Sequence, residues 1–484
     1  MDVRGPLAGS YGSAVALVLF ALTPYLILTS ALGPLDPAIQ GDLGASRADL
    51  DLVSGMSNAA YCFGTVLSVQ LAMRLPPRRI LLVYAVVLVI GSVLAAWAPS
   101  TGAFAAGHVI QGLATSLLLI AAAPALILGW PARKLRYSAI VMNMGIFGAV
   151  ALGPVIGGAF ATHWHALLWI VAGVSALSLA FGLLTFRDQE PLDPEGPVDP
   201  FALVLAATGC ALAFFGASRV VNHPFLDALV IGPIVLGLAL IAILIVHQHR
   251  VEDPLMPLRQ AAQTAATSGI VMAMTAGAVS VGLVELTRAG LEGAHVSTAE
   301  AATLFWPELG GALATAAIFG SIFFTRWVPL YAFSGLMVLA AACAVLLGAA
   351  DGSEASVAVG AGLLGLGVGA AVAPALFVAG FSMRSAQLPR VFAMIELLRG
   401  VAAFLAAPLI LHLATSTGSS PVDGLRGGFW LCMAITVGGA AIVAAIWAAG
   451  GEGLQHPRTQ SWLDGDDTAI DSPPIAAALR RRSA

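Results

Sequence analysis

The residues of this 484-residue sequence that could do chemistry are the few ionisable side chains inside its long apolar stretches. An ionisable group in hydrocarbon costs several kcal/mol, and those that are kept usually belong to ion pathways or substrate sites. Such groups can take up and release protons or recognise a charged part of a ligand. The candidates are Glu308, His108, Glu285, Glu396 and Arg399.

Glu308 is the strongest candidate for a proton carrier. It lies about nine residues into the apolar stretch 299–323, which at about 1.5 Å per residue puts it about 13 Å into a hydrocarbon core about 30 Å thick. Pro307 directly before it would open the helix locally. Desolvation at this depth favours the uncharged carboxyl. The alternative is a carboxyl kept protonated, or bonded to a freed backbone group, for purely structural reasons.

The other candidates have competing explanations. Glu285 precedes Arg288 by three residues near the end of its stretch, where an interfacial ion pair is a simpler explanation than a transport role. Glu396 and Arg399 have the same spacing but lie deeper, so a structural pair and substrate recognition both stay open. His108 lies within two turns of the start of its stretch. A lone histidine there is more often a bonded core residue, yet an unperturbed imidazole titrates at about pH 6.5 and could follow a proton gradient.

The composition is that of an integral membrane protein. Apolar residues make up 59% of the chain and charged residues only 10%. The mean hydropathy is +0.91, which water-soluble globular chains of this length do not reach. The net charge of −4 gives no support for a nucleic-acid partner. The cysteines fall inside apolar stretches without close pair spacing, and we expect small buried hydrophobes: Cys62, Cys210, Cys343 and Cys432.

Apolar stretches long enough to cross a membrane as helices occur about fourteen times, and we interpret the first as a retained span, not a cleaved signal peptide. The expected spans are 14–35, 52–72, 80–98, 103–128, 138–161, 167–186, 200–219, 225–247, 266–288, 299–323, 328–349, 355–380, 391–413 and 427–449. Polar, proline-bearing segments at 187–197 and 249–259 separate six, two and six of them.

These breaks predict the domain organisation. We expect a six-helix half at 1–186, two extra helices with flanking loops at 187–259, and a second six-helix half at 260–449. The segment 450–484 is rich in Asp, Pro and Arg and has no apolar periodicity, so we expect a disordered cytoplasmic tail.

Basic residues indicate the orientation, because short cytoplasmic loops collect Arg and Lys. With a cytoplasmic N-terminus, the inner side holds seventeen of the twenty-two Lys and Arg residues and the outer side four, while Arg399 stays within a span. We therefore expect both termini in the cytoplasm of a multi-pass protein of the cell (inner) membrane.

Three motifs follow one another along the first half of the chain. The turn after the second span carries Arg74-Leu75-Pro76-Pro77-Arg78-Arg79, the fourth span His108-Val109-Ile110-Gln111-Gly112, and the fifth span Gly153-Pro154-Val155-Ile156-Gly157-Gly158. Proline removes a backbone donor and glycines leave backbone exposed, so the fifth span must pack against close neighbours. A small-residue packing face, common in any membrane bundle, would explain that motif as well.

In this order the motifs resemble those of the major facilitator superfamily, and the fifth-span motif resembles the mark of its proton-coupled drug exporters. The arrangement of six, two and six spans is similar to the fourteen-span drug:proton antiporter branch. The resemblance implies an all-α integral membrane fold, in which two six-helix halves rock about a site near the midplane and the two inserted helices are peripheral. It also implies protons and a small hydrophobic or amphipathic substrate as partners in the lipid bilayer. We expect a monomer without cofactor or metal.

Departures from the family pattern bear on the mechanism. Met73 stands where the pattern has an aspartate that helps to latch the inner gate, and the usual glycines of that turn are absent. Leu28 falls at the acidic position of the first span, and His108 replaces the arginine that the family uses near its proton site. A lipid or glycolipid translocase on the same fold therefore stays open beside a proton-driven exporter. No nucleophile–base pair, metal-ligand cluster or phosphate loop is visible in the sequence, so we do not expect an enzyme.

Overall fold

The computed structural model describes residues 7, 9–185, 191, 198–220, 222–451 and 453–477. Within these ranges the fold is helical and contains no β-strand, and fourteen segments are long and apolar enough to span a membrane, as the sequence predicts. The segment 187–197, expected as a connecting loop, lies almost wholly outside the described residues, as do Arg4 and Arg480 to Arg482.

The chain forms two compact units. The first comprises Met1–Trp130 and Ile156–Met256, and the second comprises Pro131–Val155 and Pro257–Ala484. The fifth span is thus shared between the units, and the division falls inside its glycine-proline motif, between Val155 and Ile156.

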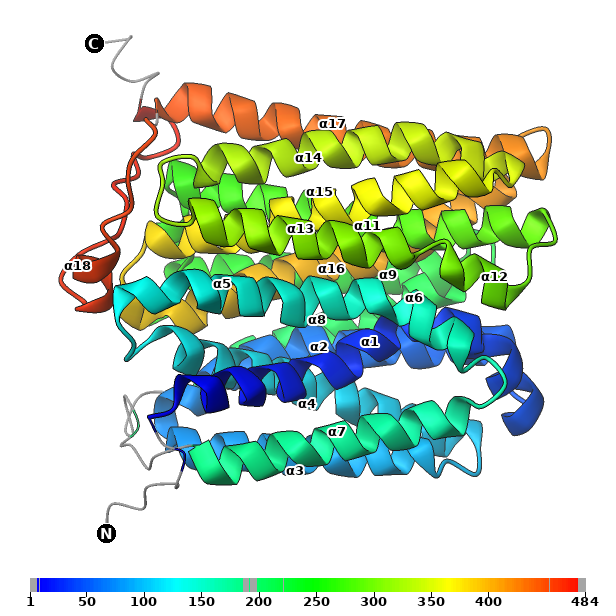
Figure 1. The fold of residues 1–484 in the computed structure, drawn as a ribbon, viewed down its shortest axis with the longest axis horizontal. Coiled ribbons are helices and arrows are strands. Elements are labelled where there is room, and N and C mark those ends of the chain that lie inside the picture. Colours follow the sequence, from blue (N-terminus) through cyan, green and yellow to red (C-terminus); the bar gives the residue numbers. More distant parts are fainter. Residues whose placement is uncertain are drawn as a thin grey trace. The chain divides into compact units, whose positions relative to one another are not determined.

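In the first unit, α4 is the central helix (Figure 1). It packs against α1, α2 and α3, and α7 packs against α1 and α3. The helices α8 and α9 pack on each other, and α8 also packs against α2. Close approach of α3 and α4 depends on Gly107, where a Cβ would lie 2.5 Å from the Ala95 nitrogen. The helices are α1 (Tyr11–Leu43), α2 (Arg47–Arg74), α3 (Pro77–Ala96), α4 (Thr101–Ile127), α7 (Trp164–Thr185), α8 (Pro200–Arg219) and α9 (Ala228–Arg250).

In the second unit, α15 lies between α11, α13 and α14, and α11 also packs against α16 and α17. The first part of the fifth span, α5 followed by the π-helical turn η2, packs against α13 and α15. The elements are α5 (Leu135–Asn143), η2 (Met144–Gly148), α6 (Ala149–Ala159, shared with the first unit), α10 (Leu258–Ala261), α11 (Thr264–Gly293), α12 (Thr298–Thr303), α13 (Trp306–Ile322), α14 (Val328–Leu346), α15 (Glu354–Phe381), α16 (Leu388–Ser416), α17 (Pro421–Gly450) and α18 (Thr459–Leu463).

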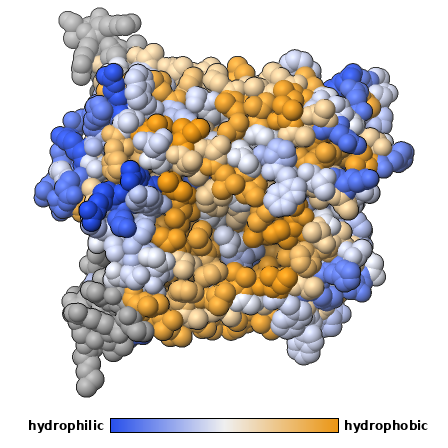
Figure 2. Space-filling model, viewed as in Figure 1, coloured by the Kyte–Doolittle hydropathy of each residue, from blue (hydrophilic) through white to orange (hydrophobic). Residues whose placement is uncertain are grey.

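The surface of the helices suits a bilayer. On the face drawn in Figure 2, apolar residues cover the middle of the helices and hydrophilic residues gather at their ends. Large apolar side chains such as Val83, Val204 and Val235 are exposed, as expected where lipid takes the place of water. Two exposed tryptophans, Trp97 and Trp327, lie at helix ends, where amphipathic rings favour the membrane interface.

The segment after Gly450 differs from the prediction, because its described residues are ordered and packed on the second unit. The Trp462 ring is buried 5.2 Å from that of Phe381, and its Nε1 donates to the Met383 carbonyl at 2.8 Å. The N–H groups of Ala469 and Ile470 donate to the Phe381 carbonyl, at 2.8 and 3.1 Å.

A second set of bonds ties the tail to the start of α11. The Thr264 N–H donates to the Pro473 carbonyl at 2.9 Å, and the Ala265 N–H donates to the Ser472 hydroxyl at 2.8 Å. The tail therefore caps the end of α15 and the beginning of α11, where helices leave backbone groups without intrahelical partners. The composition of the tail predicted disorder because composition indicates only whether a segment can form a core of its own. This segment is instead ordered by its contacts with neighbouring helices.

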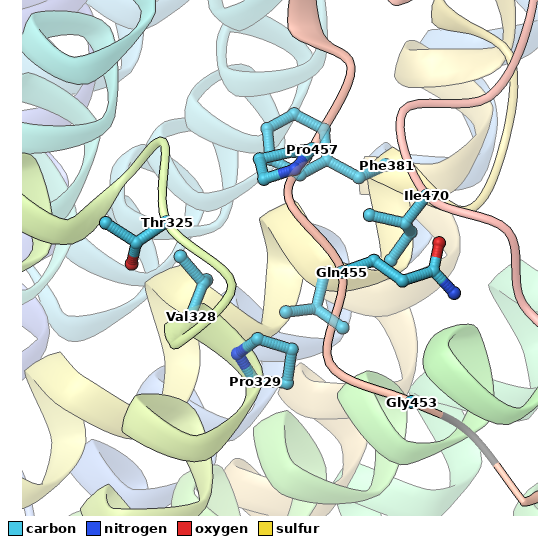
Figure 3. Close-up of a pocket in the computed structure, with 9 residues that line it drawn as sticks. Thr325, Val328, Pro329, Phe381, Gly453, Gln455, Pro457 and Ile470 are labelled. Atoms are coloured by element: carbon cyan, nitrogen blue, oxygen red, sulfur yellow. The ribbon is translucent and has the colours of Figure 1, made fainter.

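The tail also closes a small pocket at the same end of the second unit (Figure 3). Thr325, Val328 and Pro329, around the start of α14, face Gln455 and other tail residues across it. The remaining lining residues are Val378, Phe381, Gly453, Pro457 and Ile470.

Candidate functional site

The fourth-span motif is the centre of a buried hydrogen-bond network in the first unit. His108 is only 1% exposed, and its Nδ1 lies 3.1 Å from Gln111 Oε1. Because an amide oxygen only accepts, Nδ1 carries the proton of this bond. Gln111 Nε2 donates in turn to Ser92 Oγ at 3.0 Å, and Ser92 Oγ lies 3.1 Å from Ser175 Oγ on α7. The network therefore joins α3, α4 and α7.

The backbone of the same motif is bonded as well. Ser57 on α2 donates from Oγ to the His108 carbonyl at 2.7 Å, and the Tyr25 hydroxyl on α1 lies 2.8 Å from Ser57 Oγ. At Gly112 there is no room for a side chain, since a Cβ would lie 2.9 Å from the Tyr25 hydroxyl and closer still to Ser57. The bonds around His108, Gln111 and Gly112 thus connect α4 with α1, α2, α3 and α7.

Leu28, at the position where the family pattern has an acid, is fully buried in an apolar cluster of the first unit. Ala31 and Leu32 on the same helix and Phe104 on α4 belong to that cluster. The surroundings of Leu28 are therefore those of an ordinary core residue.

Glu308 lies on the second unit, in the first turn of α13. The tenth span is interrupted before it, because α12 ends at Thr303 and α13 begins at Trp306, with Pro307 in its first turn. The Glu308 side chain is buried, at 6% exposure. Its Oε2 has no hydrogen-bond partner among the described residues.

The backbone at Glu308 is fixed by a close contact with α15. A Cβ on Gly365 would overlap the Glu308 carbonyl oxygen and lie 3.0 Å from its Cα. Only glycine fits there, so the residue that carries the carboxyl cannot move away from α15 without separating the two helices. Of the other candidates on the second unit, Glu285 lies on α11, and Glu396 and Arg399 lie on α16.

Sequence reasoning missed Asn143, which ends α5. Its side chain is fully buried, and Nδ2 donates to the Gly369 carbonyl of α15 at 3.1 Å. Oδ1 has no hydrogen-bond partner among the described residues. The π-helical turn Met144–Gly148 begins at the next residue, and such turns are frequent at functional sites. Asn143 is not ionisable, but a lone amide in an apolar span is also costly, and that cost is the signal in the sequence that points to it.

The two acid–base pairs form as their spacing predicts, on different helices of the second unit. Arg288 Nη1 lies 3.2 Å from Glu285 Oε2, and the Glu285 side chain is 35% exposed. Arg399 Nη2 lies 2.5 Å from Glu396 Oε2 and its Nε 3.3 Å from Oε1. The α16 pair is buried, with Glu396 at 2% and Arg399 at 9% exposure. On α11, Gly277 leaves room for the Arg399 stem, because a Cβ there would lie 2.9 Å from Arg399 Cγ.

The fifth-span glycines are packed inside the protein. Gly153, Pro154, Gly157 and Gly158 are all buried. A Cβ on Gly157 would lie 2.5 Å from the Ala31 carbonyl oxygen of α1 and 2.9 Å from its Cα. This part of the span therefore packs against α1 at backbone contact.

The arginines of the turn after the second span lie at helix ends. Arg74 is the last residue of α2, and Arg78 and Arg79 lie in the first turn of α3. Arg79 is exposed, while Arg74 and Arg78 are half-buried. The four cysteines are buried, as expected, and none of them forms a disulfide in the part of the chain that the structure describes.

Comparison with known proteins places these features in a wider context. A family model described as Major Facilitator Superfamily matches residues 18–284. The tetracenomycin C resistance and export protein of Streptomyces glaucescens is 26% identical over 262 residues, which are 54% of this chain and 48% of that protein. The lincomycin resistance protein LmrB of Bacillus subtilis is 26% identical over 221 residues, 45% of this chain and 46% of that protein. The chain thus spans about half the length of the curated relatives it matches.

Solved structures are similar to this chain in fold over most of its length. The human organic anion transporter MFSD10 superposes with a TM-score of 0.65 at 14% identity, covering 90% of this chain and 99% of that one. A POT family transporter in complex with a thioalcohol-conjugated peptide superposes equally well, at 14% identity over 92% of this chain and 98% of that one.

Proposed function

Since the chain belongs to the major facilitator superfamily of membrane transporters, we propose that it is a proton-coupled exporter of hydrophobic or amphipathic small molecules. Relatives named for tetracenomycin C and lincomycin resistance support the substrate class. The excess of basic residues on one side of the spans supports an orientation with both termini in the cytoplasm of the cell membrane.

The observation that carries the coupling is the buried Glu308 carboxyl, whose Oε2 has no partner among the described residues. A carboxylate without a donor is costly away from water, so this group holds a proton while it is enclosed. When alternating access opens it toward the cytoplasm, water can solvate the charged form and the proton leaves. Substrate taken up from the inner side then exchanges against a proton taken up from the outer side.

Glu308→Gln tests this scheme, because it mimics the protonated carboxyl with little change in volume. We expect the variant in proteoliposomes to lose accumulation of ethidium, a lipophilic cation, against its gradient when a pH gradient is imposed. Counterflow exchange of ethidium without net proton movement should persist, because the protonated form still binds and moves.

Glu300→Gln is the matched control. Glu300 lies in the same span but is exposed, and it caps α12 through Ser297, a role that glutamine also fills. It should pump like the parent. If Glu308→Gln accumulates ethidium to the same level as the parent, Glu308 has a structural role and not a coupling role. If the parent protein translocates a fluorescent phospholipid but transports no small amphipathic molecule, the result favours the lipid translocase instead.

A further inference from the structure

The imidazole of His165 joins three helix ends of the first unit (Figure 1). His165 is the second residue of α7, and its Nδ1 lies 2.9 Å from the carbonyl oxygen of Ala96, the last residue of α3. Its Nε2 lies 3.2 Å from Oδ2 of Asp42, in the last turn of α1. The ends of α1 and α3 are thereby tied to the start of α7.

Both ring nitrogens of His165 face acceptor atoms, so both bonds can form together only on the charged ring. A carbonyl oxygen and a carboxylate oxygen accept hydrogen bonds and cannot donate them. A neutral imidazole has one N–H, and in either tautomer its other nitrogen directs a lone pair at an acceptor oxygen. The imidazolium ion donates from both nitrogens and satisfies both oxygens.

Most of the surroundings of His165 favour a positive charge. The last carbonyls of α3 form the negative end of that helix dipole, and the Asp42 carboxylate adds a full charge. The ring of Trp164 stacks on the imidazole with 3.6 Å between the ring centroids, and its Nε1 donates to the same Asp42 Oδ2 at 3.1 Å. An aromatic face attracts a cation. The positive end of α7 opposes the charge.

The ring of Trp164 leads from this surface cluster toward the fourth-span motif. Trp164 is only 3% exposed, and its ring lies 5.8 Å from that of Phe104, edge to face. The Phe104 ring in turn lies parallel to that of His108, 5.9 Å away. A change in the bonds of His165 therefore acts on a ring that packs beside the buried network of α4.

We propose that His165, Asp42 and the Ala96 carbonyl form a proton-operated latch, which holds the ends of α1, α3 and α7 together while the imidazole is charged. When the imidazole loses its proton, one of the two bonds is lost and the helix ends loosen. The latch itself needs only the fold. Its response to the pH outside the cell rests on the proposed function, whose orientation puts these helix ends on the outer side. The latch is then closed when the outer side is acidic, the condition that drives the proposed exporter.

Few other titratable groups lie on the helices packed around His165. On α7 it is the only one, and Asp42 is the one that it contacts. The others are Tyr11, Tyr25 and Asp36 on α1, Arg78, Arg79 and Tyr84 nearer the other end of α3, and His108 on α4. The neighbouring His163 is exposed, and its Nδ1 lies 2.8 Å from the Thr162 hydroxyl. A hydroxyl both donates and accepts, so that bond suits either charge state.

The test is hydrogen exchange of the full chain in lipid vesicles, corrected for the intrinsic effect of pH on exchange. It follows the amides in the last turn of α1 and the first two turns of α7. An imidazole ordinarily changes its charge between about pH 5 and pH 8. The latch is present at the acid end of this range and is lost as the pH rises. We expect about three- to tenfold more protection at the acid end, the combined effect of one charged helix cap and one exposed ion pair.

Two substitutions fix the latch in opposite states. His165→Arg keeps a charge and several donors at both ends of the pH range, so the protection should stay high. His165→Gln carries no charge, so the protection should stay low. His163→Gln is the matched control and should keep the pH dependence of the parent. Equal protection of the parent at both ends, or a parent-like pH dependence in His165→Gln, would overturn the latch. Either result leaves the coupling by Glu308 intact, because Glu308 lies on the other unit.

The side of the membrane is tested separately with Gly41→Cys, in the last turns of α1, where a Cβ meets nothing within 4 Å. A membrane-impermeant maleimide should label this thiol on intact cells. Labelling only in inverted vesicles would overturn the response to external pH together with the proposed orientation.

Discussion

At the scale of single residues, the acid–base pairs on α11 and α16 have the same spacing, but their different burial gives them different effects on stability. Glu285 and Arg288 form a partly exposed pair, whereas Glu396 and Arg399 are both buried. An exposed pair contributes about 0–1 kcal/mol. Removing one partner of a buried pair costs about 3–5 kcal/mol, because a charge is left in the interior.

Glu396→Gln should therefore lower the thermal unfolding temperature markedly, and Glu285→Gln should change it little. The double variant Glu396→Gln/Arg399→Met should recover most of the loss, since it removes the second charge as well. Unfolding can be followed with a fluorogenic maleimide, because the cysteines are buried thiols that unfolding exposes. A double variant no more stable than Glu396→Gln would show that Arg399 is held by other groups.

At the scale of the elements, the spans could be predicted because length and apolarity alone define a membrane helix. The break before Glu308 was also predictable, since Pro307 cannot donate the hydrogen bond that would continue α12 into α13. Asn143 was not, because its importance depends on α15, which lies far along the chain. The ordered structure of the tail could not be predicted either, because it depends on hydrogen bonds to the ends of other helices and not on any periodic pattern in the tail's own residues.

The fifth-span glycines allow a prediction about one helix contact. Gly157→Leu should abolish transport while the chain still inserts, because any side chain there meets the Ala31 backbone. Gly173→Leu on α7 is the control, since a Cβ at Gly173 meets nothing within 4 Å. Ethidium transport in vesicles, normalised to the amount of inserted protein, measures both. Normal transport by Gly157→Leu would mean that α1 and the fifth span can separate without loss of function.

At the scale of the whole molecule, the two units carry separate natural reporters of unfolding. Cys62 and Cys210 lie in the first unit and Cys343 and Cys432 in the second. A change confined to one unit should therefore expose only its own thiols first.

Trp462→Ala provides such a change, because the tail holds the second unit through this buried ring and its bond to the Met383 carbonyl. Removal of a buried tryptophan typically costs about 3–5 kcal/mol. We expect Cys343 and Cys432 to be labelled at a lower temperature than in the parent, with the labelling of Cys62 and Cys210 less affected. Trp97→Ala, at a position 75% exposed, is the control. Equal labelling of the parent and Trp462→Ala would mean that the tail adds nothing to the unit on which it packs.

The attachment of the tail also has a consequence for biosynthesis. The Phe381 carbonyl at the end of α15 and the N–H groups of Thr264 and Ala265 at the start of α11 find their partners in residues 469–473. A ribosome makes these partners only after it has synthesised every span of the second unit, of which α17 is the last. The second unit therefore cannot reach its final bonded state helix by helix during insertion, and a nascent chain halted before residue 469 would hold a full set of spans whose ends at this side still lack their caps.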